Sequence, residues 1–184
     1  VVPRSIDVQP RDPGSFVVAV LINAALLMLF AVQHTIMARP AFKQWWTRIV
    51  PRSVERSTFV LLASLILLLL FWQWRPLTDP IWSVEHATGR LALTGLFYLG
   101  WLIVLLSTFM IGHFDLFGLN QVYQNLRQVE IPRPEFKKPG LYKLVRHPIM
   151  LGFIIAFWAT PDMSVGHLIF AVATTGYILI GIWF

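Results

Sequence analysis

Five long stretches without a charged residue constrain the fold of this chain more than any other feature of its sequence. A helix needs about 20 mostly apolar residues to cross the hydrocarbon core of a membrane. The charge-free stretches cover Pro13–Ala38, Ser57–Trp74, Leu91–Phe114, His147–Pro161 and Met163–Phe184. The pattern predicts an all-α fold, a polytopic integral membrane helical bundle with about five transmembrane helices.

The composition agrees with a chain surrounded by membrane lipid. Hydrophobic residues make up 57% of the sequence and charged residues only 13%, whereas a soluble domain carries roughly a quarter charged residues. Too few polar side chains remain to cover a surface that faces water on all sides, which excludes a soluble domain. Intrinsic disorder is excluded because disordered chains are poor in aliphatic and aromatic residues.

The fourth stretch, from His147, is too short to cross alone. At about 1.5 Å per residue it reaches only about 22 Å, less than the roughly 30 Å of the hydrocarbon core. We therefore expect the last two helices to form a hairpin that turns at Pro161 and Asp162. Gly152 and Ala156 would give the short helix a small-residue face for close packing. In a sequence this rich in Gly and Ala, that spacing also arises by chance.

Lysine and arginine gather in two of the connections, and their distribution predicts the orientation of the chain. These connections hold Arg39, Lys43, Arg48, Arg52 and Arg56 after the first stretch, and Arg127, Arg133, Lys137, Lys138, Lys143 and Arg146 after the third. We expect both on the cytoplasmic side. Topology thereby accounts for the net charge of +6, and since no nucleic-acid module is visible, we expect no binding of nucleic acid.

The connection from Gly112 to Pro148 is the longest polar segment between the apolar stretches. Loops longer than about 15 residues are usually functional or disordered. Its first part keeps an apolar stripe of Phe114, Phe117 and Val122, which is typical of an amphipathic helix at a membrane interface.

The end of this connection predicts an anion site. Gly140 permits a tight turn, and Pro148 suits the first turn of a helix. The free N–H groups of that turn, beside Arg146, would bind a carboxylate or a phosphate. In the alternative interpretation, Arg146 and His147 are ordinary caps at the membrane interface.

Three histidines, His34, His113 and His147, fall at the predicted cytoplasmic ends of the apolar stretches. Ionisable groups at membrane depth are candidates for function, and together with Asp115 these histidines could meet in one pocket. Their spacing contains no pair of ligands on one helix, so we expect no metal site. The chain has no Cys, which excludes disulfides, thiolate metal sites and a catalytic cysteine.

The run GLYKLVRHPIMLGFIIAFWATP resembles the R-H-P-x-x-x-G signature of integral membrane methyltransferases related to isoprenylcysteine carboxyl methyltransferase and the NnrU-like proteins. Two further segments, QHTIMARPAFKQWW with the following VPRSVERST, and GHFDLFGLNQVY, are similar to the methanethiol S-methyltransferase branch. The resemblance spans nearly the whole chain. Met150 stands where the signature often has Tyr.

The resemblance implies a bacterial inner-membrane enzyme that binds S-adenosylmethionine on the cytoplasmic side and methylates methanethiol to dimethyl sulfide. The implied cofactor pocket is lined by Gly140, Tyr142, Arg146, His147, Pro148 and Gly152. Methyl transfer to a small thiol needs a thiolate and a dry, aligned pocket. We expect His113 or Asp115 as the base, His34 as the reserve base, and Arg146 as the anchor of the cofactor carboxylate.

Two alternatives stay open at this point. One is a methyltransferase for a larger lipophilic acceptor, which would need a lateral opening between helices. The other is a non-enzymatic, NnrU-like membrane accessory protein of nitrogen-oxide respiration. We expect residues 1–184 to form a single transmembrane domain that is truncated at both ends, because family members carry a helix before Val1 and an acidic segment after Phe184. The oligomeric state does not follow from the sequence.

Overall fold

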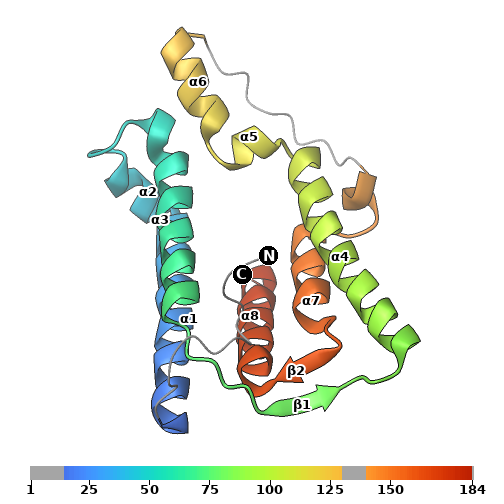
Figure 1. Cartoon of the computed structure of the whole chain (residues 1–184). Coiled ribbons are helices and arrows are strands. Elements are labelled where there is room, and N and C mark those ends of the chain that lie inside the picture. Colours follow the sequence, from blue (N-terminus) through green and yellow to red (C-terminus); the bar gives the residue numbers. More distant parts are fainter. Residues whose placement is uncertain (1–14, 130–139, 184) are drawn as a thin grey trace.

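The chain folds into a bundle of helices with two short strands at one end (Figure 1). The computed structural model describes residues 15–129 and 140–183. Its elements are α1 (Phe16–Ala38), α2 (Pro40–Trp46), α3 (Arg52–Gln73), β1 (Pro80–Ser83), α4 (Ala87–Met110), α5 (His113–Leu116), α6 (Leu119–Arg127), the 3-10 helix η1 (Gly140–Lys143), α7 (Pro148–Trp158), β2 (Asp162–Ser164) and α8 (Val165–Trp183).

The outer surface of the bundle is apolar. Among the described residues, α1, α3, α4 and α8 are long and apolar enough to cross a membrane, and α7 is a shorter apolar helix. Large side chains on these helices point outward: Leu68 is 63% exposed and Leu91 is 74% exposed. Lipid accommodates such a surface and water does not. The prediction of an all-α, polytopic membrane bundle is confirmed, with four long apolar helices and one short one.

Three predicted helix boundaries differ from the structure by four or five residues, and one of them is the start of α4, at Ala87 instead of Leu91. The helix expected from Ser57 begins earlier, at Arg52, so that charged residues occupy its first turns. The helix expected to reach Phe114 ends at Met110. Gly112 follows with φ +94°, a left-handed conformation that stops a helix, and Phe114 lies in the separate helix α5.

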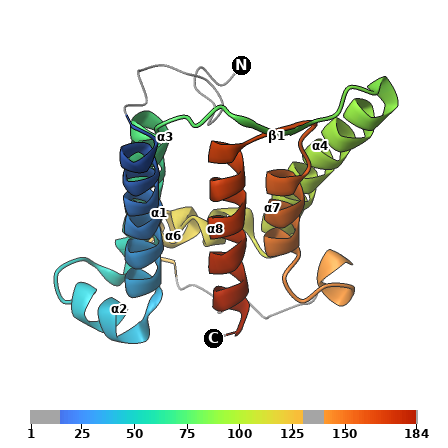
Figure 2. The same cartoon turned by 90° about the horizontal axis from the view of Figure 1, so that it is seen from below.

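The helices form two groups with α8 between them (Figures 1 and 2). Helices α1 and α3 make one group, and α4 and α7 make the other. Helices α7 and α8 run in opposite directions as the predicted hairpin. A fully buried asparagine, Asn23, fastens the first group: its Nδ2 donates to the carbonyl oxygen of Arg75 (2.7 Å) and its Oδ1 accepts from the Arg75 N–H (2.8 Å). This clamp holds the chain that leaves α3 against α1.

Helices α4 and α7 cross at glycine, as the small-residue face predicts. A Cβ atom built on Gly100 would lie 2.7 Å from the backbone nitrogen of Ala156 and 2.8 Å from the carbonyl oxygen of Gly152. A Cβ atom on Gly152 would lie 2.7 Å from the carbonyl oxygen of Gly100. The two backbones therefore touch where each helix has a glycine, which is how membrane helices approach most closely.

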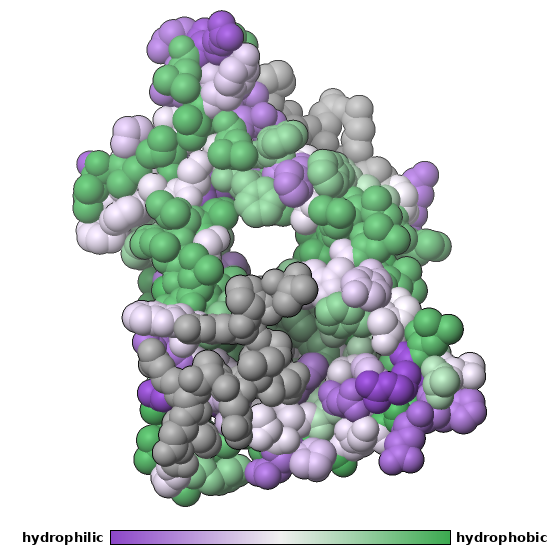
Figure 3. All heavy atoms as spheres, viewed as in Figure 1, coloured by the Kyte–Doolittle hydropathy of each residue, from purple (hydrophilic) through white to green (hydrophobic). Residues whose placement is uncertain are grey.

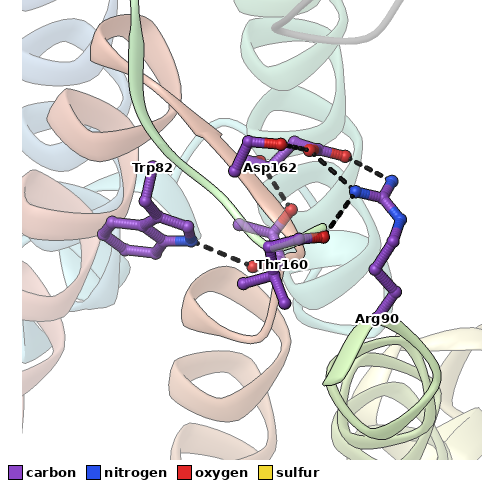
Figure 4. A network of polar contacts seen from close by, with 6 residues as sticks. Trp82, Arg90, Thr160 and Asp162 are labelled. Carbon is purple, nitrogen blue, oxygen red and sulfur yellow. Dashed lines mark hydrogen bonds and ion pairs between the residues drawn. The ribbon is translucent and has the colours of Figure 1, made fainter. Parts of the chain in front are cut away.

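The predicted turn at Asp162 is part of a small sheet that the sequence did not indicate. Strands β1 and β2 pair antiparallel, with Ser83 opposite Asp162. The Asp162 carboxylate accepts hydrogen bonds from Arg90 (Nη2 2.7 Å, Nη1 3.0 Å) and from the Ser83 hydroxyl (2.7 Å), and the Trp82 indole donates to the Thr160 carbonyl (3.3 Å) (Figure 4). The Arg90 and Ser83 hydrogen bonds lower the pKa of Asp162 to about 2.

Candidate active site

The predicted functional segments gather at the end of the bundle opposite the strands. Helices α2, α5 and α6, η1 and the start of α7 all lie at this end, and β1 and β2 lie at the other (Figure 1). The described parts of the two connections rich in Lys and Arg therefore share one end, as the predicted orientation requires. Arg133, Lys137 and Lys138 of the second connection lie outside the described residues. Which side of the membrane this end faces stays a prediction.

His113 opens α5 inside a cage of phenylalanines. Its ring stacks face to face on Phe109, with centroids 4.5 Å apart and planes 9° apart. Phe117 and Phe114 flank it at centroid distances of 4.8 Å and 5.5 Å. These ring contacts fix the plane of the imidazole and thereby the directions in which its two nitrogen atoms form hydrogen bonds.

A short hydrogen-bond chain favours one tautomer of His113. The hydroxyl of Thr108 donates its single hydrogen to the carbonyl oxygen of Leu105 (2.7 Å). The same oxygen lies 2.9 Å from Nδ1 of His113, and both hydrogen bonds form together only when it accepts a hydrogen from Nδ1. A neutral His113 thus holds its proton on Nδ1 and keeps the lone pair of Nε2, which makes no hydrogen bond to any residue that the structure describes. In this tautomer Nε2 is the nitrogen that can accept a proton.

Asp115, the second candidate base, lies differently. The Cβ position of Gly112 is 2.9 Å from its Oδ2 atom, so the carboxylate folds back over the glycine. Within the described part of the chain, no hydrogen bond or ion pair joins the side chains of Asp115 and His113. At the third position of α5, Asp115 stabilises the start of this one-turn helix.

His34, the reserve base, lies in another part of the bundle. It sits in α1 and packs against Phe30, Phe59 of α3 and Tyr177 of α8, with centroid distances of 5.4, 4.9 and 6.3 Å. Its Nδ1 atom is buried without a hydrogen-bond partner. The structure thus places His34, His113 and His147 in three separate surroundings. No group of three or more metal-ligating side chains occurs within residues 15–129 and 140–183.

The predicted cofactor residues follow one another from η1 into α7. Gly140 has φ +48°, and its Cβ position lies 2.9 Å from Cε of Met110, so η1 packs on the end of α4. Tyr142 is half-buried, and this burial raises the pKa of its phenol above 10.0. The phenol therefore stays protonated at neutral pH and is a hydrogen-bond donor rather than a base.

Arg146 and His147 are exposed, and Pro148 is fully buried as the first residue of α7. The guanidinium of Arg146 makes no hydrogen bond or ion pair with another described residue. The start of α7 has no side-chain cap from the described residues, so its first N–H groups have no side-chain partner there. Gly152, four residues further along, lies in the contact with α4. Its contact with a cofactor stays a prediction.

Sequence reasoning missed three contributors to this end of the bundle. Thr108, which contacts His113, lies in an apolar stretch of the sequence. The only indication of its role there is a hydroxyl group one turn before the polar segment that begins at Gly112. Arg56 and Ser57 of α3 hold the backbone of the α5–α6 corner. The sequence indicates Arg56 only as a basic residue of a connection and Ser57 only as the start of an apolar stretch. Their partners lie 60 and 61 residues further along the chain, and such contacts leave no local pattern.

The space-filling view shows an opening between the two helix groups, beneath α5 and α6, with mostly apolar residues on its left and right sides (Figure 3). A separate pocket of about 430 Å³ lies at the strand end. The Ser83 and Thr160 hydroxyls that line this pocket already donate hydrogen bonds to Asp162. We therefore place the candidate active site at the α5 end, where an imidazole nitrogen, a guanidinium and a helix start have no side-chain partner among the described residues.

Comparisons with known proteins agree with the resemblance. Methanethiol S-methyltransferase 2 of Bradyrhizobium diazoefficiens is 56% identical over 185 residues, which cover 100% of this chain and 70% of that protein. Methanethiol S-methyltransferase of Mycobacterium tuberculosis is 56% identical over 184 residues, 100% of this chain and 75% of that protein. Nurim of Mus musculus is more distant, at 27% identity over 165 residues, 85% of this chain and 62% of that protein.

No protein-family model and no solved structure matches the chain. The similarity to the two bacterial proteins nevertheless extends over all of its residues at a level far above chance. The chain therefore belongs to the methanethiol S-methyltransferase family.

Proposed function

We propose that this protein methylates methanethiol to dimethyl sulfide with S-adenosylmethionine as the methyl donor, at the α5 end of the bundle. The observation that supports the proposal is the pair of contacts that link Leu105, Thr108 and His113, because both hydrogen bonds form together only in the tautomer that keeps the lone pair on Nε2. Membership in a methyltransferase family favours an enzyme over an accessory protein.

In the proposed mechanism, His113 takes the proton of the thiol. A thiolate is the nucleophilic form of sulfur, and a free cysteine thiol, with a pKa of about 8.5, is mostly protonated at neutral pH. Nε2 accepts the proton, and the resulting imidazolium keeps its Nδ1 hydrogen bond to Thr108. The phenylalanine cage holds the ring in place. Asp115 contributes negative charge at this end and is the second candidate for the base.

The residues from Arg146 to Pro148 fit the carboxylate of S-adenosylmethionine. The free guanidinium of Arg146 and the uncapped N–H groups of α7 are donors of the kind that a carboxylate accepts. Gly140, Tyr142 and His147 are proposed neighbours of the same ligand, with the Tyr142 phenol as a donor. Bound there, S-adenosylmethionine supplies an activated methyl group on a sulfonium sulfur.

The acceptor has a second candidate. The apolar-walled opening between the helix groups favours a larger lipophilic acceptor, which would enter from the lipid (Figure 3). A series of thiols from methanethiol to long-chain alkyl thiols separates the two, because a one-carbon acceptor site loses turnover steeply as the chain grows. Turnover that rises with chain length would favour the lipophilic acceptor.

Donor binding is tested by calorimetric titration of S-adenosylmethionine into the protein in lipid nanodiscs. Replacing Arg146 by Gln removes a charged hydrogen bond, which corresponds to a loss of about tenfold or more in affinity. The matched control is Arg127→Gln, which removes the same charge from a guanidinium outside the proposed donor site. Arg127 lies instead over the ring of Tyr123, with 5.5 Å between its Cζ atom and the ring centroid. Absence of binding by the wild type, or equal losses in both variants, would contradict the proposed donor site.

We also propose that the α5 end faces the cytoplasm of a bacterial inner membrane. The basic connections at this end support it. Because the chain has no Cys, single cysteines can be placed at exposed positions of either end, as in Gln44→Cys and Glu85→Cys. A membrane-impermeant maleimide should label intact cells only through position 85. Labelling only through position 44 would reverse the orientation.

A further inference from the structure

The corner between α5 and α6 is built around Gly118, which has φ +77° and is buried. A Cβ atom at this position would lie 2.7 Å from both the backbone nitrogen and the hydroxyl oxygen of Ser57, and 3.0 Å from Cβ of Arg56. Only glycine accepts this backbone conformation with α3 so close. The corner is therefore seated directly on the second turn of α3.

Two hydrogen bonds fasten the corner to α3. Nε of Arg56 donates to the carbonyl oxygen of Leu116 (2.8 Å), and the hydroxyl of Ser57 donates to the carbonyl oxygen of Gly118 (3.0 Å). The carbonyl oxygens at the end of a helix lack partners within it. Arg56 satisfies one of them and adds a positive charge at the negative end of α5.

The segment that carries His113 is thus held at both ends. On one side, the imidazole is bound to Thr108 of α4 through Nδ1. On the other side, the corner at Gly118 is bound to α3. Helices α3 and α4 belong to different helix groups, so the short segment between Gly112 and Gly118 bridges the two groups (Figure 1).

We propose that Arg56 and Ser57 are positioning residues of the methyltransferase: they fix α5, and with it Nε2 of His113, relative to the rest of the active site. This inference rests on the proposed function of His113. Within the described part of the chain, no hydrogen bond or ion pair joins either residue to His113, and both act through the backbone of Leu116 and Gly118. A catalytic group displaced by about 1 Å can lose about a hundredfold in rate.

The variants that test this inference are Ser57→Ala, Arg56→Leu, Arg56→Lys and Gly118→Ala. Two matched controls are Ser53→Ala, whose hydroxyl makes no hydrogen bond to the described residues, and Gly95→Ala, whose Cβ position has nothing within 4 Å. Turnover is measured per folded protein in lipid, with kcat and the KM for the donor determined separately. Backbone hydrogen exchange of residues 113–118 is measured on the same samples.

We expect kcat to fall about tenfold or more in Ser57→Ala and Arg56→Leu, and further in Gly118→Ala, with the KM for the donor changed less than about twofold. Arg56→Lys, which keeps a donor and the charge, should recover part of kcat. Exchange in residues 113–118 should accelerate in the impaired variants and in neither control.

Unchanged kcat in Ser57→Ala and Arg56→Leu would overturn the inference, as would equal losses in the controls. A fall in thermal stability with normal kcat per folded protein would also overturn it, because it would show a merely structural role. If the wild type itself transfers no methyl group, the proposed function fails. In that case unaltered exchange in residues 113–118 would separately overturn the anchoring by α3.

Discussion

The crossing of α4 and α7 makes a sharp prediction for Gly152→Ala. The added Cβ atom would lie 2.7 Å from the carbonyl oxygen of Gly100, 2.8 Å from Cγ2 of Val104 and 3.0 Å from the Val104 nitrogen. Ordinary contacts begin at 3.4 Å, so the helices must separate by roughly 0.7 Å, the difference between 3.4 and 2.7 Å. Two of the three opposing atoms are backbone atoms, which no change of rotamer can move.

Overpacking of this kind costs about 1–3 kcal/mol, and the rigid neighbours place Gly152→Ala at the upper end. Alanine recovers up to about 1 kcal/mol through its higher helix propensity, which leaves a net loss of about 2 kcal/mol in the free energy of unfolding. The assay is reversible unfolding by SDS in mixed bicelles without any donor. Gly176→Ala in α8 is the control, because its Cβ position has nothing within 4 Å. Equal stability of the two variants would refute the close crossing.

Three further predictions follow from single contacts. Asn23→Leu leaves a backbone N–H and a carbonyl without partners, so the free energy of unfolding in bicelles should fall by about 2 kcal/mol or more; an unchanged value would contradict the clamp. The pKa of Asp162 is lowered from 3.8 to about 2, so its bond to Arg90 stabilises the fold above about pH 4 and loses this effect as the pH falls toward 2. The thermal unfolding temperatures of the wild type and of Asp162→Asn should therefore differ at pH 7 and converge near pH 2. A difference that stays constant with pH would contradict this linkage. Thr108→Val removes the acceptor that orients His113 and should lower kcat about tenfold; wild-type kcat in this variant would contradict the proposed tautomer.

The membrane bundle can be predicted from the sequence because the hydropathy of each segment depends only on its own residues. The spans need no knowledge of their neighbours, since lipid selects long apolar helices one by one. The missed sheet is different. Strand β1 starts with Pro80 and β2 has only three residues, too little for a periodic pattern, and the two pair only because α4 and α7 bring them together.

Some residues of the candidate site can likewise be predicted from the sequence, and others cannot. His113 and Arg146 stand out in the sequence because they are polar residues at the ends of apolar stretches. Thr108 and Ser57 do not, because a hydroxyl in a helix is common and its partner becomes visible only in three dimensions. The resemblance to the methyltransferases points to the segments that matter, but the assignment of Nε2 of His113 as the free base needs the bonds of Thr108.

The central claim is tested most directly by following a labelled methyl group. Purified protein in lipid is supplied with methanethiol and with S-adenosylmethionine that carries a trideuterated methyl group, and dimethyl sulfide in the headspace is analysed by mass spectrometry. We predict dimethyl sulfide with one labelled methyl group from the wild type, and a rate at least about a hundredfold lower from His113→Ala. Absence of labelled product from the wild type, or an equal rate from His113→Ala, would contradict the account.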